Sequence, residues 1–174
     1  MTSILIALAL LIGSDKPDMP FIDAGACPFE CCHYGSWTAR QSVPARQTRN
    51  QRSPVAFTIV RGEKVAALTG VVVTYKPGVV RMLKPKQLGN VRVPAGAVLY
   101  VLHRGGEGTA LFWYQGKPYW GELYAETIHK GDENYPWDVE SLPVTEWWVK
   151  VQTPRGATGW ILNPTNFDGM DACS

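Results

Sequence analysis

"WWVKVQTPRGATGWI", Trp147 to Ile161, has the pattern of two short strands joined by a turn. Side chains alternate between the two faces of a strand, so Trp147 is expected on the core face. Trp148 then shares the opposite face with Lys150. Gly156 sits in the turn and can take the positive φ that such turns require. The stretch therefore predicts a hairpin with a large aromatic surface.

The rest of the chain repeats this pattern of short apolar runs and turns. Runs rich in Val, Tyr, Phe and Trp, such as "GVVVTY", "VLYVL" and "ALFWY", are separated by Gly and Pro at close intervals, and no long amphipathic helix is evident. Residues 116–142 alternate between polar and aromatic and are expected to leave the sheet as a long loop. With 174 residues, 45% of them hydrophobic and 18% charged, the chain is predicted to be a folded all-β protein.

The charge balance argues against nucleic acid as a partner. Lys and Arg exceed Asp and Glu by only two, and they are scattered apart from one group. Nucleic-acid-binding domains usually carry a basic face or stripe. The exception is a short basic segment made of Arg40, Arg46, Arg49 and Arg52.

The N-terminus predicts export. Residues 4–13 form an apolar run that is too short to span a bilayer but long enough for the core of a signal peptide. We therefore expect residues 1–14 to be a signal peptide and the protein to be periplasmic or extracellular, without a membrane span. A Cys-rich N-terminal segment, residues 15–39, would follow.

Four cysteines lie near the two ends of the mature chain: Cys27, Cys31, Cys32 and Cys173. In an exported protein this placement predicts a disulfide clamp that joins the termini. A bond between the adjacent Cys31 and Cys32 would be strained, so two pairings remain open, in which either Cys31 or Cys32 bonds Cys27 and the other bonds Cys173. The alternative is a zinc site that uses Cys27, Cys31, His33 and Cys173 in an intracellular protein, although the second metal-binding pair that such sites usually contain is missing.

The hairpin resembles the closing hairpin of bacterial SH3-like (SH3b) domains, in which a W-x-K-V strand turns through a glycine into a G-W-[VI] strand. "VPARQTRNQRSPVAFTIVRGEKVAAL", Val43 to Leu68, resembles the opening half of the same domains, with a V-x-x-R strand, a polar loop, a second strand and a K/R-G-[DE]-x-V step. The resemblance implies a small SH3-like barrel. It also implies that the basic segment forms the first strand and the loop after it.

The stretch between these two halves departs from the family pattern. SH3b domains join them within a few residues, whereas about 75 residues, from 69 to 145, intervene here. We expect residues 40–172 to form one SH3-like β domain in which residues 69–145 are an insertion of β-hairpins and a long aromatic loop. Two SH3-like barrels are the alternative.

No motif in the chain points to catalysis. The three histidines, His33, His103 and His129, are not accompanied by a nucleophile elbow, a metalloprotease helix or a phosphate-binding loop. The glycine-rich "HRGGEGT" precedes a strand-like run rather than a helix, so a hairpin turn is favoured. The sequence thus predicts a non-enzymatic protein without cofactor or metal.

The aromatic residues of the second half predict a binding groove. Trp120, Tyr124 and Trp137 lie among polar residues of the long loop, and Trp148 has the strand parity of polar neighbours, so these four are expected to be exposed around one groove. Trp160 is expected to be buried. The family resemblance implies a monomeric module that binds a cell-wall peptide or envelope protein. The alternative is a structural or regulatory subunit that docks on another exported protein through the same patch.

Overall fold

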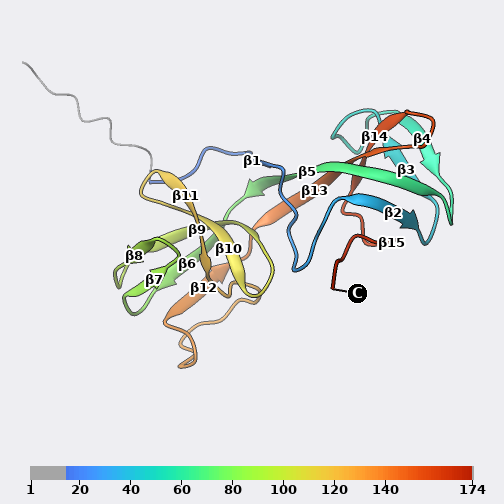
Figure 1. Ribbon diagram of the computed structural model, residues 1–174. Helices are drawn as coiled ribbons and strands as arrows, with labels where there is room; N and C mark the ends of the chain where they lie inside the picture. The colour runs from blue at the N-terminus through green and yellow to red at the C-terminus, as the bar shows by residue number, and fades with distance from the viewer. Residues whose placement is uncertain (1–14, 174) are drawn as a thin grey trace, which may run out of the picture.

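The computed structural model describes residues 15–173, in which strands joined by turns and irregular segments form two lobes (Figure 1). The expected all-β class is confirmed. Between residues 15 and 173, no helix has the length and apolar character needed to cross a membrane. The predicted signal peptide, residues 1–14, lies outside the described residues.

The main lobe is a curled, eight-stranded sheet with the order β15-β2-β5-β13-β14-β3-β4, and β1 adds to one edge. Its strands are β1 (Phe21–Ala24), β2 (Gly35–Ala39), β3 (Val43–Arg46), β4 (Val55–Ile59), β5 (Lys64–Lys76), β13 (Val144–Gln152), β14 (Thr158–Leu162) and β15 (Phe167–Asp168). The first half of β5 pairs with β2 and its second half pairs with β1, while β13 pairs along the opposite edge. All these pairs are antiparallel.

The inserted lobe comprises residues 78–141, within the stretch expected to be an insertion. Its five-stranded sheet has the order β11-β10-β9-β6-β12, and a separate hairpin is formed by β7 and β8. The strands are β6 (Gly78–Met82), β7 (Lys86–Leu88), β8 (Val91–Val93), β9 (Val98–Arg104), β10 (Thr109–Tyr114), β11 (Lys117–Glu122) and β12 (Trp137–Ser141).

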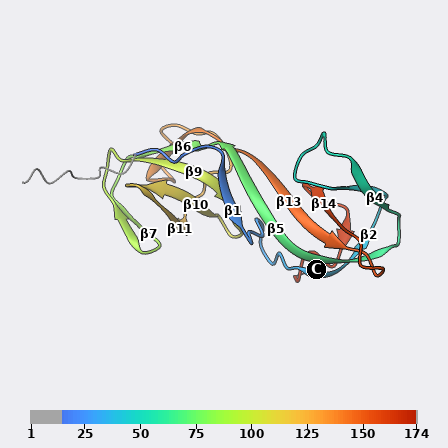
Figure 2. The same cartoon turned by 90° about the horizontal axis from the view of Figure 1, so that it is seen from above.

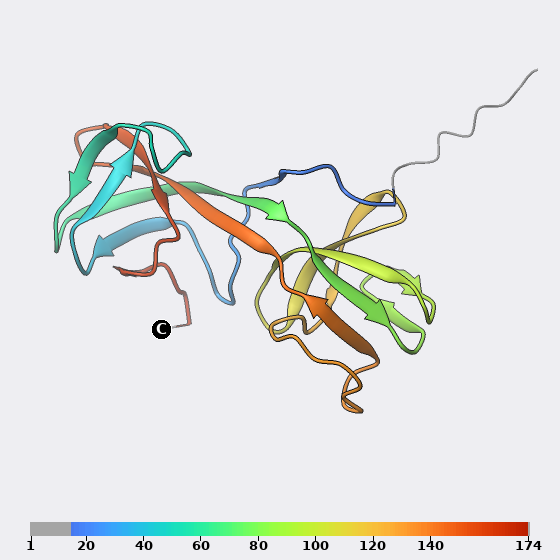
Figure 3. The same ribbon diagram turned by 180° about the vertical axis from the view of Figure 1, so that it is seen from behind.

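A continuous two-stranded ribbon connects the lobes. β5 and β13 pair from Ala66 with Gln152 to Lys76 with Val144, and these two antiparallel strands span the distance between the main lobe and the inserted lobe (Figures 2 and 3). The chain enters the inserted lobe at the end of β5 and returns from it at the start of β13. The inserted lobe is therefore attached to one end of this ribbon.

Each lobe has its own hydrophobic core. The core of the main lobe includes Trp37, Ile59 and Phe167, and none of its buried residues comes from residues 78–141. The core of the inserted lobe includes Phe112 and Trp137, and all its buried residues come from that stretch. Burial of such clusters is the main source of folding free energy, so each lobe contains the interactions that an independent unit needs.

Two disulfides are present, as expected, and one of them ties the two ends of the chain together. Cys27 bonds Cys32 and Cys31 bonds Cys173, which settles the pairing that the sequence leaves open. The sulfur atoms required by the zinc alternative are thus bonded to one another. Because disulfides form and persist in oxidising compartments, the two bonds indicate an oxidising environment.

The N-terminal segment crosses from one lobe to the other. The Lys16 ammonium lies 5.9 Å from the centre of the Tyr100 ring, and the Phe21 ring meets Trp113 edge to face at 6.3 Å. Two residues after Phe21, Asp23 Oδ2 lies 2.8 Å from His103 Nε2. This segment therefore braces the inserted lobe against β5.

The outer face of the main sheet corrects two expectations about tryptophan exposure. Trp148 lies on the face opposite the core, as its parity requires, but Val71, Val73 and Trp160 cover it, so only 1% of it is exposed. Trp160 pairs with Lys150 across the sheet and therefore shares that outer face. It is half-buried rather than buried, with the Arg49 guanidinium 5.4 Å from its ring centre. The predictions of an exposed Trp148 and a buried Trp160 are both wrong.

Candidate functional site

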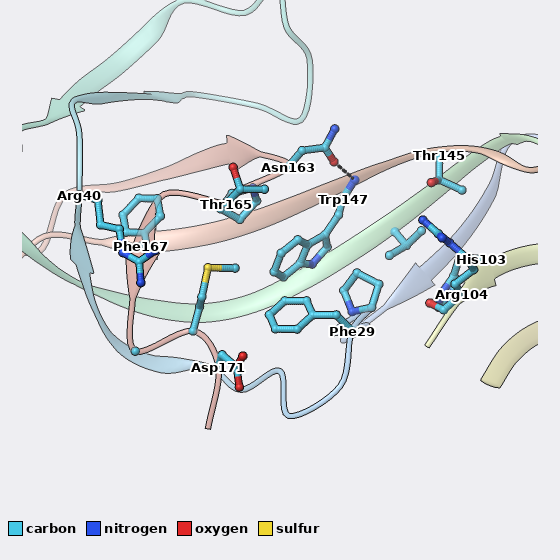
Figure 4. A pocket seen from close by; sticks show the side chains of 15 residues that line it. Phe29, Arg40, His103, Arg104, Thr145, Trp147, Asn163, Thr165, Phe167 and Asp171 are labelled. Carbon is cyan, nitrogen blue, oxygen red and sulfur yellow. Dashed lines mark hydrogen bonds between the residues drawn. The ribbon is translucent and has the colours of Figure 1, made fainter. Parts of the chain in front are cut away.

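A groove of about 520 Å³ lies between the two lobes, on the inner face of β5 and β13. Figure 4 shows Arg40 and Phe167 at one end, His103 and Arg104 at the other end, and Trp147 between them. We call this cavity the interlobe groove. Its volume lies within the usual range of ligand pockets.

Trp147 forms the floor of the interlobe groove and is held on several sides. Its indole N–H donates to the carbonyl of Ala26 at 3.2 Å, and its backbone N–H donates to Asn163 Oδ1 at 2.8 Å. Phe29 meets it edge to face with ring centres 5.7 Å apart, and Trp37 does so from the core side at 6.2 Å. A ring fixed in this way loses little freedom when a ligand packs on it.

Gly70 on β5 makes this arrangement possible. A Cβ atom at this position would lie 2.6 Å from both the indole nitrogen of Trp147 and the Ala26 carbonyl oxygen, and closer still to the Tyr34 hydroxyl. That hydroxyl also donates to the Ala26 carbonyl, and burial raises the pKa of the Tyr34 phenol. The absence of a side chain at residue 70 lets the N-terminal segment approach the floor.

The two ends of the chain form the lower wall of the groove. Phe29 comes from the loop closed by the first disulfide, and Phe167 and Met170 come from the C-terminal tail. The tail is held by backbone bonds from His33 N–H to Met170 O at 3.1 Å and from Arg40 N–H to Asn166 O at 2.8 Å. The Cys31–Cys173 bond lies just beyond, so the long-range disulfide maintains this wall.

The charged residues that line the groove are Arg40, Arg104 and Asp171. Arg104 is exposed and forms no ion pair with any residue in the described range, whereas Arg40 Nε lies 2.6 Å from Asp168 Oδ1. Thr145 offers a hydroxyl, and Asn163 retains its amide N–H₂ because its oxygen is used by Trp147. The groove is thus suited to a ligand with an apolar body and carboxylate or carbonyl oxygens.

His103 is buried, with 3% exposure, at the end of the groove near the inserted lobe. Its Nδ1 lies 2.9 Å from the carbonyl oxygen of Arg104, and its Nε2 bonds Asp23. Both ring nitrogens of His103 thus have an oxygen partner within hydrogen-bonding distance. Neither ring nitrogen is left to act on a ligand.

The four aromatic residues expected to form a groove do not come together. Trp137 is 1% exposed in the core of the inserted lobe, where its N–H donates to the Tyr124 carbonyl at 3.2 Å, so its predicted exposure is wrong. Trp148 is buried in the other lobe. Trp120 and Tyr124 are exposed at 47% and 46%, as expected, but neither lines the interlobe groove.

Sequence reasoning missed the residues that do line the groove. Phe29 and Met170 each lie within a few positions of a cysteine, and the expected clamp between the two ends of the chain already placed these neighbourhoods together. That signal could have identified the lower wall. Arg104 has no comparable signal, because it reaches the groove only through the docking of the inserted lobe, and Asn163 has none in its sequence neighbourhood.

Comparisons with protein-family models, with curated proteins and with solved structures found no match to this chain.

Proposed function

We propose that this protein is a non-catalytic, exported binding module that holds an extended, carboxylate-bearing peptide in the interlobe groove, and that the natural ligand is a cell-wall peptide. The observation that carries the proposal is the groove itself. It combines a rigid aromatic floor at Trp147 with donor groups and with Arg104, which forms no ion pair with any of residues 15–173. Cell-wall peptides carry free carboxylates on a short chain, which matches this chemistry.

The non-catalytic part of the proposal is supported by how the reactive groups are used. All four cysteines are in disulfides, and both ring nitrogens of His103 have partners. Neither a cysteine thiol nor the imidazole of His103 is therefore available for a nucleophilic mechanism in the groove. The SH3-like resemblance of the two half-motifs supports the same class of function.

A charge-reversal experiment tests the proposal. Oxidised protein lacking residues 1–14 is titrated by calorimetry with a synthetic cell-wall stem pentapeptide and with the same peptide amidated at its carboxylates. We expect Arg104→Glu to weaken binding of the free-acid peptide by at least about tenfold, equivalent to about 1.4 kcal/mol. Amidation of the peptide should have a similar effect on the unmodified protein.

Lys130→Glu is the matched control, since Lys130 is exposed in the inserted lobe and does not line the groove. It makes the same change in net charge and should leave the affinity unchanged within about a factor of two. Equal affinities of the two variants, or no effect of amidation, would contradict the proposal.

A further inference from the structure

A second hollow, of about 560 Å³, lies on the outer face of the sheet of the inserted lobe. Strand register explains which side chains reach it. Leu111 on β10 pairs with Trp120 on β11 and with His103 on β9, so these three share the face turned away from the core of the lobe. The N-terminal segment crosses this face and contributes Phe21 and Asp23 to the hollow.

The prominent feature of this hollow is an exposed but supported indole ring. Trp120 is 47% exposed, and the ring of His103 meets it edge to face, with centres 5.3 Å apart. The six-membered part of the indole passes over Gly105, where a Cβ atom would lie 2.9 Å from it. His103 is in turn fixed by Asp23 and by the carbonyl of Arg104, so the exposed ring is backed by a bonded network.

The polar groups around this ring include both donors and acceptors. Asp23 uses Oδ2 for His103 and keeps Oδ1 as an acceptor, and Asn90 offers both an oxygen and an N–H₂ group. Lys117 adds an ammonium group, which lies 5.1 Å from the centre of the Tyr119 ring.

From this geometry we propose that the hollow is a carbohydrate-binding site, with Trp120 as the stacking platform. A sugar ring has an apolar face of C–H groups, which packs on an indole, and a rim of hydroxyl groups, each of which both donates and accepts hydrogen bonds. Asp23, Asn90 and Lys117 supply partners of both kinds beside the ring. The hollow has room for a short oligosaccharide, because its volume is that of an ordinary ligand pocket.

The two sites meet at one pair of residues. His103 lines the interlobe groove and its partner Asp23 lines the sugar site, so the His103–Asp23 contact separates them. The sugar site does not depend on the proposed peptide ligand, and the two proposals can fail separately.

The test uses tri-N-acetylchitotriose, cellotriose and maltotriose as probes, with the oxidised protein lacking residues 1–14. Affinity is measured by calorimetry, and saturation-transfer NMR identifies which sugar protons contact the protein. We expect at least one probe to bind, with transfer strongest to the C–H protons of one ring face. Trp120→Ala should weaken this binding at least about tenfold, and Trp120→Tyr should lose less, because it keeps a ring.

Tyr124→Ala is the matched control, because Tyr124 is equally exposed in the same lobe and does not line the hollow. It should leave sugar binding unchanged. Asn90→Ala removes a hydrogen-bonding group without touching the aromatic packing, and a loss of threefold or more is expected of it, roughly the value of a weak hydrogen bond. This second variant keeps the test decisive if Trp120→Ala proves unfolded by circular dichroism.

Three results would overturn the sugar site. The first is that none of the probes binds at millimolar concentration. The second is that binding survives both Trp120→Ala and Asn90→Ala. The third is that Arg104→Glu abolishes sugar binding while Trp120→Ala does not, which would place the sugar in the interlobe groove. Binding of a proline-rich peptide that depends on Trp120, in the absence of sugar binding, would identify the hollow as a peptide site instead.

Discussion

Glu146 organises the outer face of the main sheet through three hydrogen bonds. Its Oε2 accepts from the Trp148 indole at 2.9 Å and from the Tyr75 hydroxyl at 2.8 Å, and its Oε1 accepts from Gln51 at 2.7 Å. Burial by itself raises the pKa of Glu146, but the hydrogen bonds from Trp148, Gln51 and Tyr75 outweigh it, and the net pKa is lowered. These bonds bring the polar loop after β3 onto the sheet and close it over Trp148.

Glu146→Gln should therefore reduce the free energy of unfolding at neutral pH, by about 0.5 to 1 kcal/mol after allowance for solvent screening. A lowered carboxyl pKa stabilises the fold above the unfolded-state pKa, and the gain is lost as the pH falls through the folded-state value. The difference in the free energy of unfolding between the parent protein and the variant should thus be largest at pH 7 and should shrink as the pH falls below about 4.

Urea unfolding at pH 7 and pH 3 measures this difference. Glu126→Gln, at an exposed position of the inserted lobe, serves as the control and should change stability little at either pH. If the free energy of unfolding of Glu146→Gln changes with pH as much as that of the parent protein, the hydrogen bonds to the carboxylate contribute nothing to stability.

Strand parity could be predicted at the residue scale, whereas exposure could not. Alternation correctly places Trp147 on the core face, and Trp148 on the other. Whether an outward-facing residue is exposed depends on what covers it, and Trp148 is covered by Trp160 from the next strand and by Gln51 through Glu146. The prediction that Trp160 is buried was wrong because its pairing with Lys150, and not its apolar sequence neighbours, determines that it lies on the outer face of the sheet.

At the scale of elements, the C-terminal tail depends on a single covalent tie. The Cys31–Cys173 bond closes a separation of 142 residues, whereas Cys27–Cys32 closes a separation of 5. In the chain-entropy model the first bond contributes about 5 kcal/mol and the second about 2 kcal/mol, both as upper guides. The two bonds therefore differ in what their removal should do.

The paired change Cys31→Ser and Cys173→Ser should lower the free energy of unfolding by several kcal/mol, up to about 5. Amide hydrogens of residues 165–172 should exchange faster, because Phe167 and Met170 lose their anchor while the inserted lobe keeps its own core. The pair Cys27→Ser and Cys32→Ser is the control, with a smaller loss. Urea unfolding and hydrogen-exchange mass spectrometry measure both effects, and equal losses for the two pairs, or unchanged exchange of the tail, would refute the assigned role.

The hairpin at Trp147–Ile161 and the cysteine clamp could both be predicted from the sequence. The hairpin depends only on neighbouring residues, and the clamp depends only on how four cysteines can pair. The hairpin follows from alternation and a turn glycine, and the clamp from four cysteines with few strain-free pairings. The clamp accounts for the position of Phe29, but the interlobe groove as a whole follows from neither rule. Arg104 comes from the inserted lobe, and only the three-dimensional path of that lobe brings it to the groove.

At the scale of the whole molecule, the separate cores predict that the main lobe can fold without the inserted lobe. The test is a variant in which Asn-Gly replaces residues 77–143, so that Lys76 and Val144 flank a two-residue turn. We expect this variant to unfold cooperatively in urea and to keep a near-ultraviolet dichroism signal from its buried tryptophans. Its stability should be lower than that of the full chain, because Phe21, Asp23 and Thr74 lose partners in the inserted lobe.

A non-cooperative transition, or loss of the aromatic dichroism signal, would show that the main lobe needs the inserted lobe to fold. The variant should also lose peptide binding, because Arg104 is removed with the inserted lobe. Retention of the full affinity would place the peptide elsewhere on the main lobe.

The β5–β13 ribbon also determines how the molecule responds to force. Tension that pulls the lobes apart is carried along two covalent backbones, whereas bending of one lobe toward the other is opposed by the smaller contacts of the N-terminal segment, Phe21 with Trp113 and Asp23 with His103. The protein should therefore resist stretching along the ribbon more strongly than it resists bending of one lobe toward the other. Because the inserted lobe contributes His103 and Arg104 to the interlobe groove, the angle between the lobes sets the width of the groove at that end.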